Sequence, residues 1–368
     1  MTTLLLAGGG TAGHVNPLLA IADRIRLRRP DDELIVLGTA EGLEARLVPE
    51  RGYELATIPR LPFPRRPDGY ALRFPGRYRA AVRRVEALIA ERGVDAVVGV
   101  GGYAAAPAYS AAHRRGVPIV IHEANAVPGY ANRLGARWAA GVGIAFRGTP
   151  LRPRGGAAEL VGMPLRPEIE RLADPGRRRA ARTEAAALFG LDPTRPVLLA
   201  TGGSSGAQRI NEAIAGAAAA ITAAGWQILH LTGEHRDAVA AELPDYHPVR
   251  YADRMDLALA AADLAVSRAG TSTVAELSAL GIPAVLVPYA VGNGEQRRNA
   301  AEAVAAGGAI LVEDAACSVE WASTALVALL GDRDRIAAMA ERMATTGVPD
   351  ATDRMVALVE RALPPGPA

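Results

Sequence analysis

Residues 3–20, TLLLAGGGTAGHVNPLLA, place an apolar run, a glycine-rich turn and a second apolar segment in direct succession. The run at 4–7 is typical of a buried strand, and the segment after the turn has helical spacing, with Pro17 near its start. Glycines leave the N–H groups of the turn unobstructed by Cβ atoms, so the turn could face an anion or a sugar. This strand–turn–helix unit predicts the first step of a parallel α/β domain.

The same alternation continues along the chain. Further short aliphatic runs, separated by alanine-rich helical segments, are residues 34–37, 96–100, 119–121, 197–200, 228–231, 264–266 and 284–287. This rhythm predicts parallel sheets with ligands gathered at their carboxyl edges. It lapses into Pro, Gly and Arg between 146 and 192, and a second glycine turn then restarts it. We therefore expect an N-terminal domain at 1–161, a C-terminal domain at 162–345, and a final helix and tail at 346–368 that could pack back on the first domain.

Composition excludes several classes of function. The chain has 368 residues with 41 Lys+Arg, 39 Asp+Glu and a formal charge of +2, so no global field points to nucleic acid. Every cation is an arginine, which excludes a phosphate-loop lysine and Schiff-base chemistry. Cys317 is the single cysteine, which leaves no internal disulfide and suits a reducing compartment. The N-terminus has no positive region typical of a secretory signal, so the cytoplasm is the default location.

The first glycine turn formally matches the G-x-G-x-x-G pattern of dinucleotide sites. Such a site also requires an acidic residue after the second strand, but that strand runs into Gly38-Thr39 instead. This weakens the alternative that the chain is an NAD-type oxidoreductase that uses this turn. His14 follows the turn at the expected helix start. It could serve as a general base, or it could simply hydrogen-bond at the helix terminus.

Two more strand ends carry polar groups in the first half. GVGGY ends at Tyr103, and the next strand ends in HEAN, which supplies Glu123 and Asn125. Carboxylate, amide and phenol groups at neighbouring strand ends suit a polyhydroxylated ligand. Alternatively, Glu123 satisfies loop amides and Asn125 caps a helix.

The second half repeats the design. TGGSSGA at 201–207 predicts a phosphate cradle without lysine, and RAGTSTVAE at 268–276 places hydroxyls and a carboxylate at a helix start. Glu276 could hold a ribose diol or complete a capping box with Thr273. Gln296 follows at the next strand–helix turn, where an ordinary helix start is an equal alternative.

Taken in order, these motifs resemble the MurG family of cell-wall glycosyltransferases. The segments that carry the resemblance are GGGTAGHVNPLLA, GVGGYAAAP, HEANAVPGYANR, VGMPLR, TGGSSGAQRIN, RAGTSTVAELSALGIPAVLVPY and GNGEQRRNA, spread from residue 8 to about 300. Two positions depart from the family pattern: Ala124 stands where that family has Gln in HEQN, and the first turn reads TAG where many relatives read TGG.

The resemblance implies a GT-B fold, with two Rossmann-like domains of parallel sheet separated by a deep cleft. It implies inverting transfer of N-acetylglucosamine from UDP-GlcNAc to the muramoyl C4 hydroxyl of lipid I. The products are lipid II and UDP, in peptidoglycan synthesis for cell growth and division. It implies no cofactor and no protein-bound metal, because loop amides, Ser204 and Arg166 would stabilise the leaving pyrophosphate. An epimerase that uses UDP-GlcNAc on the same fold, or a non-catalytic scaffold that binds sugar nucleotides, remains an alternative.

Matching motif to motif implies the site residues. The catalytic base would be His14, with Glu123 as the alternative. Acceptor contacts would come from Gly102, Tyr103 and Asn132. Donor contacts would come from Thr11, Ala12, Gly13, Asn125, Arg166, Ser204, Thr271, Ser272, Thr273, Val274, Ala275, Glu276 and Gln296.

A lipid-linked acceptor requires a surface that meets the membrane. Segments 61–66 (LPFPRR) and 70–79 (YALRFPGRYR) interleave aromatic and arginine side chains, which suits the anionic inner leaflet. The residues expected there are Phe63, Arg73, Phe74 and Arg77; the alternative is a solvated arginine-rich helix with its aromatics in the core. We thus expect a peripheral protein at the cytoplasmic face of the plasma membrane, with other cell-wall synthesis proteins as candidate partners.

Overall fold

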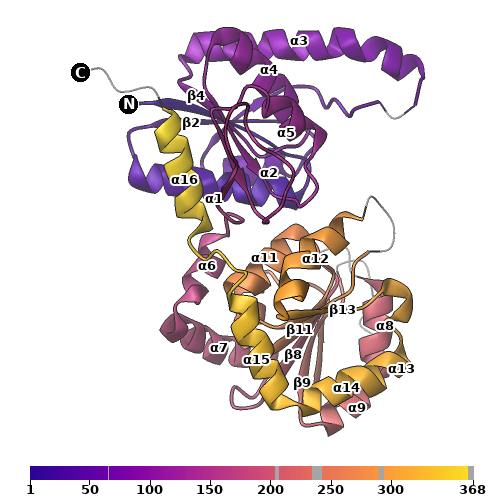
Figure 1. Ribbon diagram of the computed structural model, residues 1–368. Coiled ribbons are helices and arrows are strands. Elements are labelled where there is room, and N and C mark those ends of the chain that lie inside the picture. The colour runs from indigo at the N-terminus through magenta and orange to yellow at the C-terminus, as the bar shows by residue number, and fades with distance from the viewer. Residues whose placement is uncertain (65, 204–206, 234–242, 290–293, 364–368) are drawn as a thin grey trace. The chain divides into compact units, whose positions relative to one another are not determined.

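The computed structural model describes residues 1–64, 66–203, 207–233, 243–289 and 294–363. The chain forms two compact units (Figure 1). Unit 1 comprises Met1–Arg166 together with Asp350–Ala368, and unit 2 comprises Pro167–Pro349. The chain therefore leaves unit 1, builds unit 2, and returns to unit 1 at its end.

Unit 1 is a seven-stranded parallel sheet with the order β3-β2-β1-β4-β5-β6-β7. The strands are β1 (Thr3–Ala7), β2 (Glu33–Gly38), β3 (Glu54–Thr57), β4 (Ala96–Gly99), β5 (Ile119–Glu123), β6 (Gly141–Ile144) and β7 (Glu159–Leu160). The helices are α1 (Ala12–Arg28), α2 (Glu44–Glu50), α3 (Gly69–Arg92), α4 (Ala105–Arg115), α5 (Tyr130–Gly135) and α16 (Ala351–Ala362). Central β1 is buried along its whole length, as expected of a strand covered on both faces.

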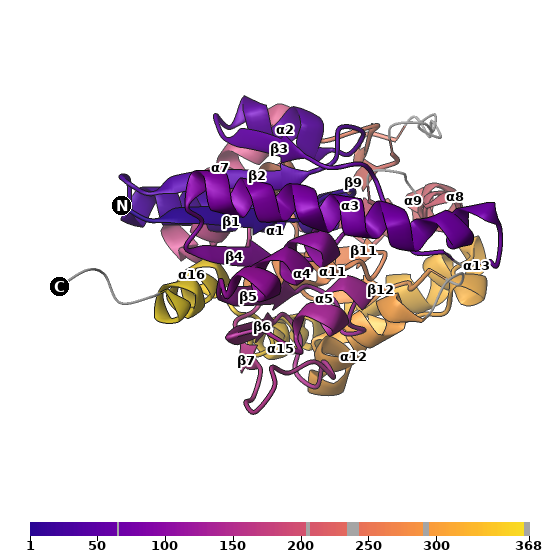
Figure 2. The same ribbon diagram turned by 90° about the horizontal axis from the view of Figure 1, so that it is seen from above.

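Helices cover both faces of this sheet (Figure 2). One core joins the sheet to α3, α4 and α5 through side chains such as Val85 and Tyr109. The opposite core joins it to α1, α2 and α16. In α16, Met355, Val356 and Val359 are at most 1% exposed. Burying such a side chain contributes about 1.5–3 kcal/mol, so the last helix is an integral part of unit 1.

Unit 2 is a six-stranded parallel sheet with the order β10-β9-β8-β11-β12-β13. The strands are β8 (Val197–Thr201), β9 (Gln227–Leu231), β10 (Tyr246–Val249), β11 (Leu264–Ser267), β12 (Ala284–Leu286) and β13 (Ala309–Leu311). The α-helices are α6 (Pro167–Glu170), α7 (Pro175–Phe189), α8 (Gln208–Gly216), α9 (Ala218–Ala223), α10 (Met255–Ala261), α11 (Thr271–Ala279), α12 (Glu295–Ala306), α13 (Val319–Trp321), α14 (Val327–Gly331) and α15 (Arg333–Ala344). Short 3-10 turns at Arg171–Ala173 and Asp314–Ala316 and a π-helical stretch at Ala322–Leu326 complete it.

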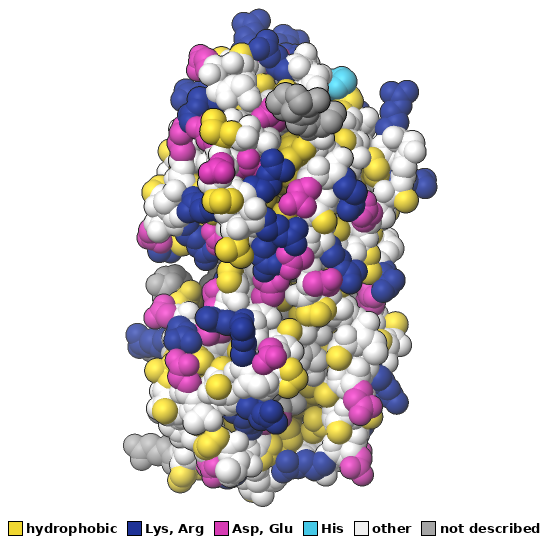
Figure 3. Space-filling view, turned by 90° about the vertical axis from the view of Figure 1, so that its left-hand side faces the viewer, with side chains coloured by type: hydrophobic (Ala, Val, Ile, Leu, Met, Phe, Trp, Pro, Cys, Tyr) yellow, Lys and Arg dark blue, Asp and Glu magenta, His cyan; other side chains and the backbone are white. Residues whose placement is uncertain are grey.

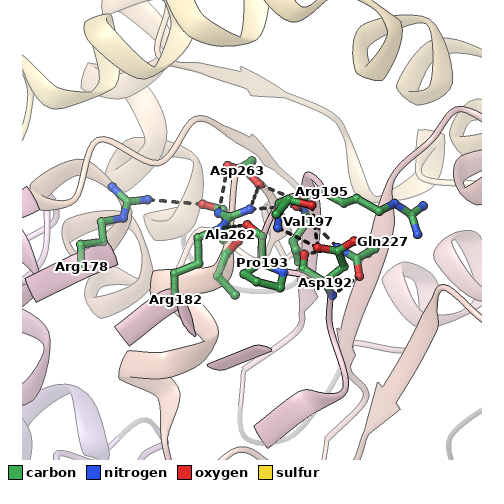
Figure 4. Close-up of polar contacts among 11 residues, drawn as sticks. Arg178, Arg182, Asp192, Pro193, Arg195, Val197, Gln227, Ala262 and Asp263 are labelled. Carbon is green, nitrogen blue, oxygen red and sulfur yellow. Dashed lines mark hydrogen bonds and ion pairs between the residues drawn. The ribbon is translucent and has the colours of Figure 1, made fainter. Parts of the chain in front are cut away.

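A polar network closes the amino-terminal edge of the unit 2 sheet (Figure 4). Arg182, from α7, donates to both carboxylate oxygens of Asp263, at 2.9 and 3.1 Å, and to the carbonyls of Ala261 and Arg195. Asp263 also accepts from the N–H of Val197 at 2.8 Å, at the start of β8. Because this edge lies opposite the loops that follow the strands, the network stabilises the unit without occupying its ligand edge.

In both parallel sheets, the order in which successive strands are added reverses at the centre. The two strands on either side of that point are β1 and β4 in unit 1, and β8 and β11 in unit 2. In open parallel sheets, loops that leave these strands diverge at the carboxyl edge and leave room for a ligand. The topology therefore selects four loops, two in each unit, as the places to search for a site.

Charges on the visible face of the molecule are mixed. Figure 3 shows arginine and carboxylate side chains interspersed there. On this face, therefore, positive and negative side chains are not separated into two large patches of opposite charge.

Candidate active site

The two selected loops of unit 1 pack backbone against backbone. A Cβ on Gly102 would lie 2.5 Å from the carbonyl oxygen of Gly9, and one on Gly8 would lie 2.4 Å from a methyl of Val100. Gly102 also has φ +86, a conformation that side chains disfavour. The glycines of both loops are therefore required for their mutual approach.

His14 lies on the first turn of α1, half-buried beside these loops. Its Nδ1 is 3.2 Å from the hydroxyl of Thr11, the residue that precedes the helix. The ring turns its Nε2 edge toward Gly101, where a Cβ would lie 3.2 Å from that nitrogen. Burial lowers the pKa of His14 below its ordinary value, and the carboxylate of Glu44 partly opposes this. At neutral pH the imidazole is therefore mostly uncharged and able to accept a proton.

Glu123, the alternative base, is buried at the end of β5 and bonded on both oxygens. One oxygen accepts from the N–H and the side-chain amide of Asn125, at 2.9 and 3.3 Å. The other accepts from the N–H of Gly129 at 3.0 Å and the amide of Asn132 at 2.9 Å. Burial raises the pKa of Glu123. In this arrangement the carboxylate organises the loop from 124 to 129, as the alternative interpretation of the sequence describes.

Asn132 is also committed to the protein interior. Its Oδ1 accepts from the phenol of Tyr109 at 2.8 Å, and its Nδ2 donates to the carbonyl of His122 at 3.1 Å as well as to Glu123. The side chain is 1% exposed. It therefore fixes α5 against β5, and any contact with an acceptor must come from the loops in front of it.

Tyr103 and Arg60 stand in front of the glycine turns. A Cβ on Gly10 would lie 3.7 Å from the ring of Tyr103. The guanidinium of Arg60 lies over that ring, 4.9 Å from its centroid, and donates to its hydroxyl at 3.4 Å. Arg60 was not predicted from the sequence, because a lone arginine after a short edge strand carries no signal.

A second unpredicted residue, Glu44, lies beneath the first glycine turn. It is 1% exposed, and it accepts hydrogen bonds from the N–H of Gly10 at 2.8 Å and from the N–H and hydroxyl of Thr39 at 2.9 and 2.8 Å. These bonds lower its pKa although burial acts in the opposite direction. One amide of the turn is thus bonded to an ionised carboxylate inside the protein.

The remaining predicted residues of unit 1 lie around this site and at the unit boundary. Ala12 is the first residue of α1 and Gly13 the second. Asn125 lies in the loop after β5, half-buried. Arg166 is the last residue of the first segment of unit 1, partly buried.

In unit 2, the predicted donor residues meet where α11 and α12 begin. Gly270 caps α11, Thr271 is its first residue, and Glu276 is 9% exposed on its buried side. Asn299, on α12, donates to the carbonyl of Ala269 and to the hydroxyl of Thr271, each at 3.3 Å. The same turns of α11 contain Ser272, Thr273 and Ala275, which are half-buried, and Val274, which is buried. One loop and two helices are thereby held together.

The capping-box alternative for Glu276 is wrong. It required Thr273 to precede the helix, whereas α11 begins two residues earlier, at Thr271, and its cap residue Gly270 has no side chain to bond. Glu276 therefore lies in the second turn of the helix.

Gln296 lies in the first turn of α12, where its Oε1 accepts from the N–H of Tyr289 at 2.9 Å. Ser204, which follows β8 in the sequence, lies outside the described residues. Among the residues that are described, no group of three or more His, Cys, Asp or Glu side chains could hold a metal ion.

An aromatic cluster is formed by α3, α5 and Phe63 in the segment before α3, with Phe74 half-buried against the core. The ring of Phe63 is 5.7 Å from those of Phe74 and Tyr130, and Phe63 and Tyr130 are 63% and 76% exposed. Arg77 lies over the ring of Tyr70 and Arg133 over that of Tyr130. The other predicted cation, Arg73, is exposed and donates to a carbonyl of its own helix. Beside the cluster, a hollow of about 560 Å³ is lined by Arg133, Ala136, Arg137, Trp138, Pro150, Leu151, Arg152 and Arg154.

Comparison with known proteins places this geometry in a family. The N-terminal domain of glycosyltransferase family 28 matches residues 4–144, and the C-terminal domain of the same family matches residues 197–355. A UDP-N-acetylglucosamine--N-acetylmuramyl-(pentapeptide) pyrophosphoryl-undecaprenol N-acetylglucosamine transferase from Leifsonia xyli is 61% identical over 99% of both chains. A protein of the same name from Streptomyces coelicolor is 49% identical over 98% of both. The chain belongs to the MurG family.

Solved structures agree with this assignment. MurG from Acinetobacter baumannii superposes with a TM-score of 0.79 at 26% identity, covering 98% of this chain and 100% of that one. A putative UDP-N-acetylglucosamine 2-epimerase from Listeria monocytogenes superposes with a TM-score of 0.66 at 12% identity, which shows a shared fold alone. The predicted fold class, two Rossmann-like parallel-sheet domains of GT-B type, is confirmed, and the chain is a glycosyltransferase.

Proposed function

We propose that this protein transfers N-acetylglucosamine from UDP-GlcNAc to the muramoyl C4 hydroxyl of lipid I, with inversion. The products are β-1,4-linked lipid II and UDP. The observation that carries the proposal is 61% identity over nearly the whole chain to a relative whose name states this transfer. The arrangement of His14 at the turns of unit 1 supplies a group suited to the chemistry.

The proposed step is a single displacement. The acceptor oxygen attacks the anomeric carbon of the donor sugar while its proton moves to Nε2 of His14, and the bond to UDP breaks with its electron pair. This role requires the tautomer in which Nδ1–H donates to Thr11, because only that tautomer leaves the lone pair on Nε2. Glu123 suits the base role less well, since both of its oxygens are already bonded to its own loop.

The donor would be held by unit 2. In our proposal Glu276 binds the ribose hydroxyls, the N-terminal turn of α11 faces the pyrophosphate, and Gln296 contacts the sugar. Support comes from the bonds of Asn299, which hold the loop before α11 and the start of that helix together. Thr11, Ala12, Gly13, Asn125, Arg166 and Ser204 would add contacts.

Release of UDP by the purified protein tests the function. With UDP-GlcNAc and a soluble lipid I analogue, wild type should release UDP and form a disaccharide product, and His14→Ala should release it at least about 100-fold more slowly. Glu276→Ala should instead raise KM for UDP-GlcNAc. UDP release in the absence of the analogue would favour an epimerase, and donor binding without turnover would favour a scaffold.

We further propose that the aromatic cluster on α3 and α5 contacts an anionic membrane surface from the cytoplasmic side. None of the helices within the described ranges is sufficiently long and apolar to span a bilayer. Exposed rings flanked by arginines suit contact with the membrane surface, because each cation near an anionic surface contributes about 1 kcal/mol.

Vesicle binding tests that surface. Replacing Phe63, Arg73, Phe74 and Arg77 together should weaken sedimentation with vesicles containing anionic lipid and leave UDP binding intact. A matched control replaces four exposed residues of unit 2, Arg333, Arg335, Leu188 and Val319. Undiminished sedimentation of the first variant would refute the proposal.

A further inference from the structure

We propose that Glu44 is a positioning residue for the transfer reaction, which holds the first glycine turn in place and sets a negative charge behind His14. This inference rests on the proposed function. It concerns a buried residue of α2 and assigns a positioning role to its ionised carboxylate.

The carboxylate is bonded from two segments at once. Gly10, in the turn after β1, donates its N–H to Oε2, and Thr39, after β2, donates its N–H and hydroxyl to Oε1. Charged hydrogen bonds of this kind are about twice as strong as neutral ones. A single side chain therefore fixes the relative position of two strand ends.

Three glycines make room for this ion. A Cβ on Gly9 would lie 2.3 Å from Oε1, one on Gly42 would lie 2.1 Å from Oε2, and one on Gly38 would lie 2.5 Å from Cγ of Glu44. Gly9 also has φ +147. Each of these three backbones approaches the carboxylate at a distance that a Cβ would forbid. The glycines around Glu44 are therefore explained by the ion rather than by a bound ligand.

An internal anion changes what the turn can bind. A phosphate at the amide of Gly10 would compete with Glu44 for the same donor and would meet its negative charge. The turn in unit 1 is thus a support for the helix start that carries His14, and a ligand phosphate has to lie in front of it, on the side of Arg60 and Tyr103.

The charge also acts on His14. The titratable groups that face this imidazole are Glu44 from α2 and His122 from β5, whose own pKa is lowered in part by His14. Neutral partners are Thr11 and the loop at Gly101. When His14 takes the acceptor proton, the imidazolium forms in a largely desolvated place, and the fixed charge of Glu44 stabilises it.

Glu44→Gln tests the inference, because it removes the charge at nearly constant shape. We expect kcat to fall about 10-fold or more, with KM for UDP-GlcNAc within about 2-fold of wild type. The midpoint of the acid limb of kcat/KM should move to lower pH, since the group that raises the pKa of His14 is gone. Glu50→Gln, an exposed residue of the same helix paired with Arg46, is the matched control and should change neither quantity.

A titration of the His14 C2 proton by NMR gives a second readout that needs no activity. Its midpoint should be lower in Glu44→Gln than in wild type. A folded variant with an unmoved midpoint overturns the inference, as does wild-type kcat. If wild type itself shows no turnover, the proposed function fails while the titration still tests the effect of Glu44 on His14.

If Glu44→Gln fails to fold, Thr39→Val is the variant that tests the role of Glu44. This isosteric change removes one of the three hydrogen bonds to the carboxylate and leaves its charge in place. We expect kcat to fall several-fold with KM for the donor unchanged. Wild-type kcat in this variant would overturn the inference.

Discussion

At the scale of single residues, the pKa of His14 makes the clearest prediction. Burial lowers this pKa below 6.5, so the imidazole stays neutral at pH 7. If His14 is the base, as we propose, activity should be lost only as the pH falls below 6.5. The rate profile of kcat/KM should thus be flat near neutrality with an acid limb centred below pH 6.5. In His14→Ala the residual rate should lose this limb, and a limb that persists unchanged would assign it to another group.

Thr11 offers a test of the tautomer. In Thr11→Val the hydroxyl that faces Nδ1 of His14 is lost. The imidazole ring can then rotate, and the tautomer with its lone pair on Nε2 is no longer favoured. We expect kcat to fall about 10-fold, less than in His14→Ala. Thr345→Val, which removes an exposed hydroxyl bonded within its own helix turn in unit 2, is the control. Equal rates for the two variants would contradict the orienting role.

Sequence reasoning found the residues at strand ends and missed those that act from elsewhere. His14 lies in the first helical turn after β1 and Glu123 is the last residue of β5, at the sheet edge where the parallel fold places functional groups. Glu44 lies in the first turn of a helix, where an acidic residue ordinarily favours the helix dipole, so its sequence position carries no special signal. Its partners come from two other loops, and such contacts are visible only after folding.

At the scale of elements, Arg182 should be the most sensitive ion-pair residue of α7. It connects this helix to Asp263 and to three backbone carbonyls at the edge of the sheet. Arg182→Met should lower the free energy of unfolding of unit 2 by about 1–2 kcal/mol, because several partly buried acceptors lose their donor. Urea unfolding measures this.

The control for that prediction is Arg46→Met. Arg46 pairs with Glu50 one turn away on the surface of α2, and both side chains are more than half exposed. Such pairs contribute at most about 0.5 kcal/mol. If Arg182→Met lowers the free energy of unfolding no more than this control does, the network around Arg182 contributes little to stability.

Strands were predicted where apolar runs are continuous and missed where they are not. The eight predicted runs coincide with β1, β2, β4, β5, β8, β9, β11 and β12. The missed strands β3, β7, β10 and β13 are short and lie at or beside sheet edges, where one side is partly solvated and the apolar pattern weakens. β6 is GVGI, in which alternate glycines remove the pattern although the strand is buried.

At the scale of the whole molecule, buried histidines set the response to acid. His122 in unit 1 and His230 in unit 2 are fully buried, and burial lowers the pKa of each to about 4. Their folded pKa lies below the unfolded value, so the unfolded chain binds more protons as the pH falls from 6.5 toward 4, and stability is lost in that window. At pH 5 the loss is about 2 kcal/mol for each histidine.

Unit 2 gives the simpler measurement, since in unit 1 the raised pKa of Glu123 acts in the opposite direction. The free energy of unfolding of unit 2 should fall between pH 7 and pH 5 in wild type. His230→Gln, which removes the titrating ring from its bonds with Tyr246 and Asn211, should be destabilised at pH 7 and lose less on acidification. An identical pH dependence in the two proteins would exclude His230 as the cause.

The return of the chain to unit 1 has a consequence for synthesis. Because α16 follows unit 2 in the sequence, the face of the first sheet that it covers stays open to solvent throughout translation of residues 167–349. Unit 2, whose sequence is continuous, can fold while still tethered. A chain that terminates before α16 would therefore carry a complete unit 2 and an incomplete unit 1 with an exposed apolar surface, the feature by which chaperones and proteases recognise defective products.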